Sequence, residues 1–216
     1  MLRKLRKITQ EELDTILKKY DQRVDADEVD GESTDLSYTD LRGFNLTKFN
    51  LSYVNLEGAN LTHANLSHVD LSHVNLSCAD LEGVNLLGAD LTGADLRYAN
   101  LKGANLRDVY LHYANLSNAN LAGAYLPYAD LYEADLTGAK LTGANLRHVN
   151  LFSADLKGAD LHHADLSSVN LKGANLEAAI LDCTDLTCAD LSGSTFKPAS
   201  IRHADLHLVT LSNAKL

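Results

Sequence analysis

A leucine returns at every fifth residue over most of this chain, without one interruption. Steps of five from Leu36 to Leu216 give 37 positions, of which 35 are Leu and the other two are Phe196 and Ile201. Two residues before these positions stands a small residue, mostly Ala or Val, at all but two, which are Phe44 and Phe49. One residue before the leucine stands Asp or Asn at 29 of the 37. All the glycines except Gly31 fall two residues after the leucine. This period constrains the fold more than any other feature of the sequence.

A period of five fits neither an α-helix nor a flat β-strand. On a helix each step of five residues turns by about 140°, so the leucines would spread around the whole cylinder. On a strand they would alternate between the two faces. The chain must therefore turn once per repeat, with the small residue and the leucine pointing inward and the Asp or Asn between them pointing outward. The last two residues then form a corner, where glycine adopts backbone angles that other residues resist.

A single repeat buries too little apolar surface to be stable, so the repeats must stack into coils that share one core. The sequence therefore predicts an all-β solenoid. The units Ala59-Asn60-Leu61, Ala94-Asp95-Leu96 and Ala144-Asn145-Leu146 resemble the pentapeptide-repeat family. The resemblance implies a right-handed quadrilateral β-helix with four pentapeptides in each coil and about nine coils. Members of this family are mostly non-enzymatic, and several resemble B-form DNA in shape and charge and inhibit DNA gyrase or protect it.

The chain divides into residues 1–33 and the repeat domain, residues 34–216. One helix is predicted from residue 8 to about residue 22, because Thr9 and Glu12 form a capping box at its start. The first coil of a β-helix exposes an edge that proteins normally cover, so we expect this helix to cap it; a partner-binding helix is the alternative. The helix is preceded by a basic, solvated tail and followed by an acidic link from Asp21 to Ser33. Its apolar stripe, spaced for one helix face, is Leu13, Ile16, Leu17 and Tyr20.

The composition is that of an acidic protein without secretory or membrane signals. The chain has 216 residues, 22% of them charged, and a net charge of −10. No signal-peptide core follows the basic start, and no apolar run approaches the length of a transmembrane helix. Three cysteines without a zinc spacing or a disulfide framework are typical of a reducing compartment. We therefore expect a cytoplasmic protein that neither enters a membrane nor binds nucleic acid directly.

No catalytic, metal or cofactor site is predicted. His63, His68 and His73 occupy successive corners of one coil, too far apart for one ion, and His163, Cys183 and His203 share a corner column. Alternate members of that column would stand nearly 10 Å apart at the usual strand spacing, so we interpret these residues as surface positions. A solid Leu and Ala interior leaves no substrate cavity. No phosphate-binding loop, nucleophile elbow or triad is present.

Aromatic residues gather on the predicted surface near the middle of the rod. Exposed aromatics in a patch tend to mark interaction surfaces, but stacked aromatics can also simply stabilise neighbouring coils. Both interpretations stay open from the sequence. The residues of this predicted patch are Tyr110, His112, Tyr113, Tyr125, Tyr128, Tyr132 and Phe152.

The function that the sequence favours is a rigid, non-enzymatic scaffold or interaction rod that presents columns of side chains to a protein partner. The alternative is a DNA mimic that binds DNA gyrase or a topoisomerase and inhibits or protects it, since an acidic rod can enter a basic cleft. At the C-terminal end the repeats loosen around Phe196 and Pro198. Exposed leucines there suggest a homodimer through the C-terminal coil, although a tolerated open end is also compatible with the sequence.

Overall fold

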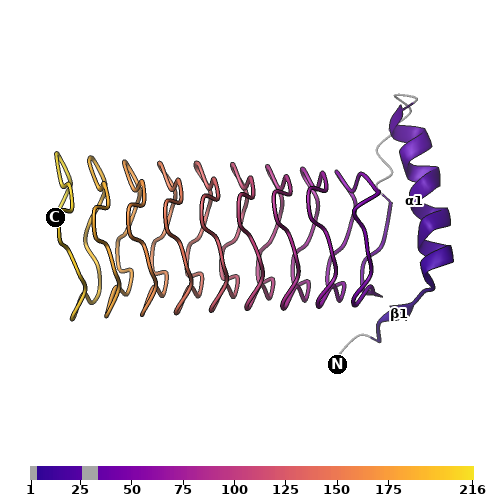
Figure 1. Ribbon diagram of the computed structural model, residues 1–216, viewed down its shortest axis with the longest axis horizontal. Helices are drawn as coiled ribbons and strands as arrows, with labels where there is room; N and C mark the ends of the chain where they lie inside the picture. Colours follow the sequence, from indigo (N-terminus) through magenta and orange to yellow (C-terminus); the bar gives the residue numbers. More distant parts are fainter. Residues whose placement is uncertain (1–3, 26–33) are drawn as a thin grey trace.

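The computed structural model of this protein describes residues 4–25 and 34–216. Three regular elements are present in these ranges: strand β1 (Arg6–Lys7), helix α1 (Gln10–Asp25) and strand β2 (Thr39–Asp40). The rest of the described chain winds into a stack of similar coils, with α1 lying across its N-terminal end (Figure 1). The molecule is therefore a solenoid, as the five-residue period predicts.

Each coil contains four pentapeptides, because parallel bridges join residues that lie 20 apart in the sequence, from Asp35↔Asn55 to Thr195↔Lys215. Around one such bridge, the Leu61 amide donates to the Asp80 carbonyl at 2.7 Å, and the Asp80 amide donates to the Ala59 carbonyl at 2.9 Å. The same ladder repeats on all four sides of the stack. The right-handed sense of the coil stays a prediction from the resemblance.

The residue before each leucine has two structural tasks, which explain the preference for Asp and Asn. Its side-chain oxygen accepts from the amide two residues later, as when Ser77 N donates to Asn75 Oδ1 at 3.0 Å. An Asn can also donate to the coil before it, as Asn75 Nδ2 does to Asn55 Oδ1 at 3.1 Å. These contacts close the corner and tie neighbouring coils together.

The interior is a mostly apolar stack of leucines and small residues. Leu116 and Ala119 have no exposed surface, and the other repeat leucines from Leu36 to Leu191 are exposed by no more than 1%. Fully burying a leucine contributes about 1.5 to 3 kcal/mol. The inward leucine and small residue, and the outward Asp or Asn, thus lie as the period predicts.

The corners hold more than glycine. The second corner residue has a left-handed backbone whether it is Gly83 (φ +62) or a side chain such as His63 (φ 57). A Cβ added to Gly83 would lie 2.4 Å from Nδ1 of His63, so the imidazole rests on this glycine of the following coil. The same relation joins His68 to Gly88 and His73 to Gly93. At these corners the missing Cβ of the glycine leaves room for a side chain of the coil before it.

Helix α1 covers the first coil. Leu13 and Leu17 are fully buried, Tyr20 is 3% exposed, and the Tyr20 hydroxyl donates to the Ser52 carbonyl. Ile16 is partly buried against the same core. The capping box forms, since Thr9 N donates to Glu12 Oε2 at 2.7 Å and Glu12 N to Thr9 Oγ1 at 3.2 Å. No helix in the described ranges is long and apolar enough to cross a membrane.

Two boundaries at this end differ from the sequence expectation. Helix α1 continues to Asp25, past the expected end near residue 22, so the predicted acidic link starts later; residues 26–33 lie outside the described residues. The side chains of Arg6 and Lys7 are exposed, as expected of a solvated tail, but their backbone pairs in parallel with Thr39 and Asp40 as β1 and β2, which the sequence did not predict. A two-residue strand leaves no periodic signal in a sequence, which is why it was missed. Residues 1–3 lie outside the described residues.

Candidate functional site

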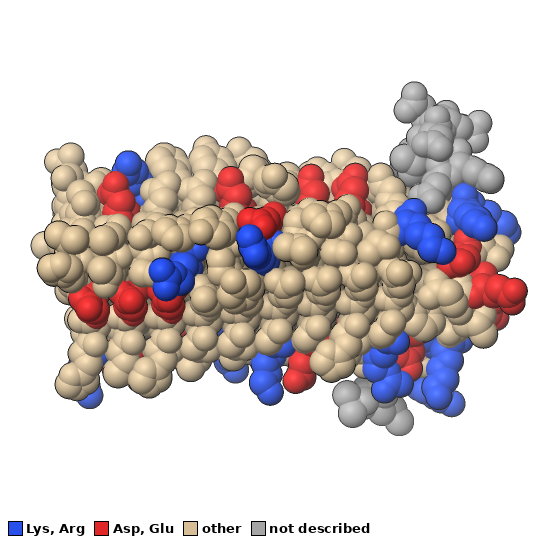
Figure 2. Space-filling view, in the orientation of Figure 1, with Lys and Arg blue, Asp and Glu red and all other residues tan. Residues whose placement is uncertain are grey.

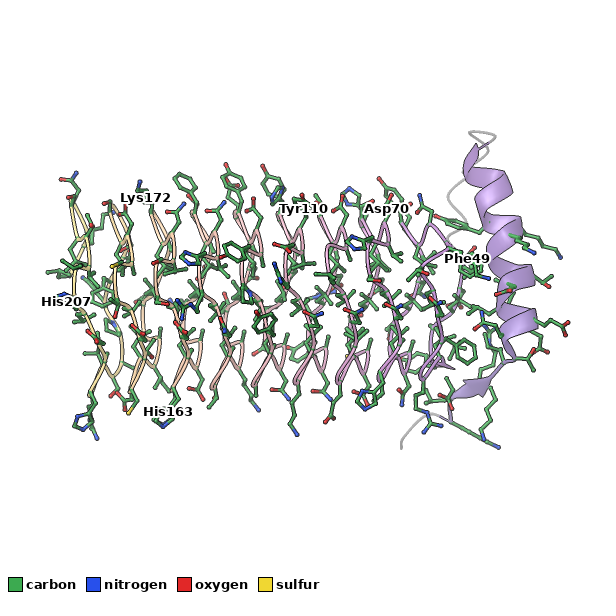
Figure 3. All side chains as sticks on the ribbon, viewed as in Figure 1. Phe49, Asp70, Tyr110, His163, Lys172 and His207 are labelled. Carbon is green, nitrogen blue, oxygen red and sulfur yellow. The ribbon has the colours of Figure 1, made fainter. Side chains whose placement is uncertain are left out.

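One side of the rod carries most of the predicted aromatic residues. We call it the Tyr110 face: the outward column from Asn50 to Thr210 in steps of 20, together with the two corner residues that follow each of its leucines. Asp70, Tyr110 and Lys172 mark its course along one edge of the rod in Figure 3. Parallel bridges place Tyr110 directly between Asp90 and Asp130 in this column.

Five rings of this face contact one another over three successive coils. Tyr132 is central: its ring stacks on Phe152 at a centroid distance of 5.6 Å and an angle of 9°, and meets Tyr113 edge-on at 5.5 Å. His112 joins Tyr132 at 6.2 Å and Tyr110 at 6.0 Å, both edge-on. We call these five residues, Tyr110, His112, Tyr113, Tyr132 and Phe152, the aromatic cluster.

The other two predicted patch residues lie outside the cluster. Tyr128 sits at the preceding corner and stacks on His148, with ring centroids 5.2 Å apart and an angle of 12°. Tyr125 belongs to the adjacent side, where it bridges Asn105 and Asn145. Both are exposed, at 56% and 45%. Five of the seven predicted patch residues therefore contact one another, and the other two lie on the adjacent side.

The polar contacts of the cluster converge on Asp130. His112 Nε2 is shielded from solvent and lies 2.9 Å from Asp130 Oδ2, close enough for an ion pair but without hydrogen-bond geometry. The other oxygen, Oδ1, accepts from Asn150 Nδ2 at 2.8 Å and from the Tyr132 amide at 3.2 Å. Asp130 thus holds His112 and Tyr132 in place from within the face.

Glu133 raises the pKa of the Tyr132 hydroxyl. A hydrogen bond from that hydroxyl to the Glu133 carboxylate, with partial burial and the nearby negative charge, raises the pKa of Tyr132 to about 12. The phenol is therefore a neutral donor throughout the physiological range.

Much of the cluster surface faces solvent. Tyr113 is 59% exposed, Tyr110 51% and Phe152 37%. Large exposed apolar groups gathered in one patch often mark a binding surface. The aromatic cluster is therefore the strongest candidate binding site on the described rod.

The histidines and cysteines form no metal centre. No group of His, Cys, Asp and Glu within residues 4–25 and 34–216 could hold an ion. His63, His68 and His73 pack on glycines at three different corners. All three cysteines are free, and Cys78 and Cys188 are exposed. An open hollow of about 810 Å³ lies beside Ile8 and Ile16, between β1 and the start of α1. The sequence carried no signal for it, because it arises from the pairing of β1.

The acidic residues of the described rod are interrupted by basic ones, and several of the basic side chains form ion pairs. Figure 2 shows Asp and Glu in short groups, interrupted by Lys, Arg and uncharged side chains. The longest uninterrupted acidic column is Asp165, Asp185 and Asp205, near the C-terminal end. Its first member pairs with Arg147 at 3.8 Å. Other ion pairs join Arg97 to Asp95, Lys102 to Glu82, Arg107 to Asp108, Lys157 to Glu177 and Lys172 to Asp190.

The fold is a β-solenoid of five-residue repeats whose interior holds the buried leucines and small residues. The family model of pentapeptide repeats matches eight copies between residues 45 and 216. The chain belongs to the pentapeptide repeat family.

Solved structures of several relatives are similar to this chain. HetL, a pentapeptide repeat protein involved in heterocyst differentiation regulation from the cyanobacterium Nostoc sp. strain PCC 7120, is 32% identical over 92% of this chain and 94% of its own, with a TM-score of 0.44. A pentapeptide repeat protein from the Arabidopsis thaliana thylakoid lumen is 34% identical over 50% of this chain and 71% of its own, with a TM-score of 0.45.

QnrB1, a plasmid-mediated fluoroquinolone resistance protein, is 20% identical over 84% of this chain and 91% of its own, with a TM-score of 0.51. At this identity the likeness shows a shared fold. No curated protein matches this chain.

Proposed function

We propose that this protein is a non-enzymatic interaction rod that presents fixed columns of side chains to a protein partner, with the aromatic cluster as its main contact. The observation that carries the proposal is the exposure of Tyr110 and Tyr113, at 51% and 59%, beside rings that are already packed. Tyrosine is enriched among the residues that dominate binding energy at interfaces. Tyr125 and Tyr128 extend the contact onto the adjacent side.

The stabilising role of stacked aromatics accounts for only part of the cluster. Tyr132 and Phe152 lie face to face on consecutive coils and support the stack as cross-strand pairs do. Tyr110 replaces an Asp or Asn that would have closed its corner by a hydrogen bond, and half of its side chain remains in water. A residue that gives up a structural contact and stays exposed is better explained by binding than by packing.

The remaining parts of the chain support this rod. We assign residues 1–33 to a basic tail, a capping helix and an acidic link, and residues 34–216 to the right-handed repeat domain. In the helix, Leu13, Ile16, Leu17 and Tyr20 cover the first coil. The core side chains of the repeats are buried, which supports a function without catalysis, cofactor or metal. We place the protein in the cytoplasm, where free thiols persist.

The C-terminal coil is a second, smaller contact surface. Leu206, Leu211 and Leu216 are exposed by 43%, 40% and 74%. Pairing of this coil with the same coil of a second copy would cover these leucines through an isologous interface. Sedimentation equilibrium tests this: a dimer that Leu206→Glu dissociates supports the pairing, and a monomer at all concentrations contradicts it.

A gyrase-binding DNA mimic is the second candidate, favoured by the column of Asp165, Asp185 and Asp205. A supercoiling assay with purified DNA gyrase, with and without a quinolone, tests it. Inhibition or protection that weakens with salt and with Asp185→Asn would support the mimic. Full activity of gyrase at all concentrations of this protein would contradict it.

The interaction rod is tested by affinity capture from a cell extract with the purified protein as bait. The variant Tyr110→Ser/Tyr113→Ser/Phe152→Ser removes the exposed rings of the cluster. Tyr98→Ser is the matched control, because Tyr98 is 64% exposed at a different corner. We expect specific partners to be captured by the parent and the control but lost from the cluster variant. The same partners on all three baits would contradict the assignment of the site.

A further inference from the structure

The aromatic cluster lies on the one side of the middle of the rod that has no cationic side chain. Between Asn50 and Ser153, the Tyr110 face carries four carboxylates and no Lys or Arg. The first cation on this face is Lys172, and it is paired with Asp190 at 3.1 Å. The four carboxylates are Asp70, Asp90, Asp130 and Glu133.

The coil that contains Tyr110 makes this asymmetry plain. Three of its corners carry a cation, and each cation is paired: Arg97 to Asp95 at 2.6 Å, Lys102 to Glu82 at 3.7 Å and Arg107 to Asp108 at 3.2 Å. The fourth corner carries His112 and Tyr113. No Lys or Arg of this coil therefore pairs with a carboxylate of the Tyr110 face.

The carboxylates stand beside the exposed rings. Asp90 and Asp130 flank Tyr110 in the same column, about 4.8 Å away on each side at the usual strand spacing. Asp90 Oδ1 accepts from Thr92 N at 2.9 Å, and among the described residues no Lys or Arg pairs with Asp90 or Glu133. Glu133 is exposed next to Tyr132. An aromatic face bordered by carboxylates that have no Lys or Arg partner attracts a planar cation.

We propose that the Tyr110 face binds an arginine-bearing segment of its protein partner, with guanidinium groups stacked on Tyr110 and Tyr113 and paired with Asp90 and Glu133. This rests on the proposed function and names the partner chemistry of the same site. Arginine fits better than lysine because its planar guanidinium stacks on a ring and donates two parallel hydrogen bonds to a carboxylate at once. Lysine offers a compact charge that stays strongly hydrated.

The test is fluorescence anisotropy with a labelled short peptide of alternating Arg and Gly, its Lys counterpart, and the parent protein at low and physiological salt. We expect the Arg peptide to bind several-fold more tightly than the Lys peptide. Tyr110→Ser should weaken the Arg peptide about 2- to 5-fold, and Asp90→Asn should weaken both peptides. Urea unfolding midpoints equal to that of the parent show that these variants are folded.

Two control variants separate this site from charge alone. Asp185→Asn removes a carboxylate from the acidic column on the adjacent side, and Tyr98→Ser removes a ring at a different corner. Neither should change the affinity for the Arg peptide. Equal binding of the Arg and Lys peptides, equal losses in the controls, or no saturable binding would each overturn the proposal. Capture of partners that still depends on the aromatic cluster would then leave the interaction rod standing without an arginine site.

Discussion

The two ends of the solenoid carry the same repeat but differ in what covers it. At the N-terminal end Leu36 and Leu41 are 1% exposed, because Leu13 and Leu17 of α1 and strand β1 pack against the first coil. In the last described coil Leu206 and Leu211 are 43% and 40% exposed. The motif places each leucine on the inner side of its coil. Whether that leucine is buried depends on whether a coil or a helix covers it on both sides.

The difference follows from the one-dimensional architecture of repeat proteins. Each coil contacts only the coil before it and the coil after it, so stability is close to a sum over coils and their interfaces. Leu116 has a covering coil on both sides and no exposed surface. The same change should therefore cost much more in the middle of the rod than in its last coil.

The largest effect is expected from deleting one residue. Deletion of Ser117 would put every later leucine out of register with the coil before it, and we expect loss of the single cooperative unfolding transition. Deletion of Ser212 displaces only Leu216 and should leave the transition intact. Urea unfolding followed by circular dichroism measures both. Equal midpoints for the parent and the Ser117 deletion would contradict the shared register.

Truncation of a leucine compares the two regions directly. Leu116→Ala should lower the free energy of unfolding by about 2 to 5 kcal/mol, because it removes buried methyl groups and leaves a cavity. Leu211 already keeps 40% of its surface in water, so Leu211→Ala should cost less than about half of that. Denaturant titrations of both variants give the two values, and similar losses would contradict the comparison.

Enlarging a small residue tests how narrow the interior is. Ala119 is fully buried, and Ala119→Phe should destabilise the protein by about 1 to 3 kcal/mol through overpacking. Phe49 occupies the same small-residue position under α1, where it is 7% exposed and labelled beside the helix in Figure 3. The N-terminal end therefore accommodates a ring, and Phe49→Ala should destabilise it. An unchanged midpoint for Ala119→Phe would show that the middle is not narrow.

The period alone was enough to predict the repeated part of the fold. The leucine points inward and the Asp or Asn points outward at Leu116 and its equivalents, because every repeat has the same backbone conformation and hydrogen bonds. Strand β1 could not be predicted, because Arg6 and Lys7 form it only by pairing with residues far along the chain.

The candidate site was partly within reach of the sequence. Residues 20 apart share a column, which correctly stacks Tyr132 on Phe152. The prediction from residue spacing put Tyr125 and Tyr128 within the patch, but spacing does not give the direction of a side chain. The ring of Tyr128 stacks on His148 instead. The contact of His112 with Asp130 depends on side-chain rotamers, which no repeat pattern specifies.

Two corner glycines offer a smaller test, which compares a glycine that contacts a side chain of the coil before it with a glycine that does not. Gly83→Ala and Gly103→Ala both place a Cβ on a left-handed backbone, which costs about 1 to 2 kcal/mol. Only the first would also meet a ring, with its Cβ 2.4 Å from His63 Nδ1, whereas nothing lies within 4 Å of the second. Gly83→Ala should therefore be the more destabilising by about 1 kcal/mol. In a His63→Ala background the difference should vanish, and its persistence would contradict the contact.

The smallest effect on folding is expected at the surface, where Glu133 sets the ionisation of Tyr132. The folded pKa of about 12 lies above the ordinary value of 10.0, so the fold favours the neutral phenol. The stabilisation from this hydrogen bond is therefore fully present below pH 10 and is lost as the pH rises from there through about 12. Glu133→Gln removes the charge and should move the pKa of Tyr132 back toward 10.0, with a small loss of stability at neutral pH because the hydrogen bond to a charged acceptor is weakened. Ultraviolet difference spectra of the two proteins between these pH values measure the shift, and identical titration curves would show that Glu133 does not hold the phenol.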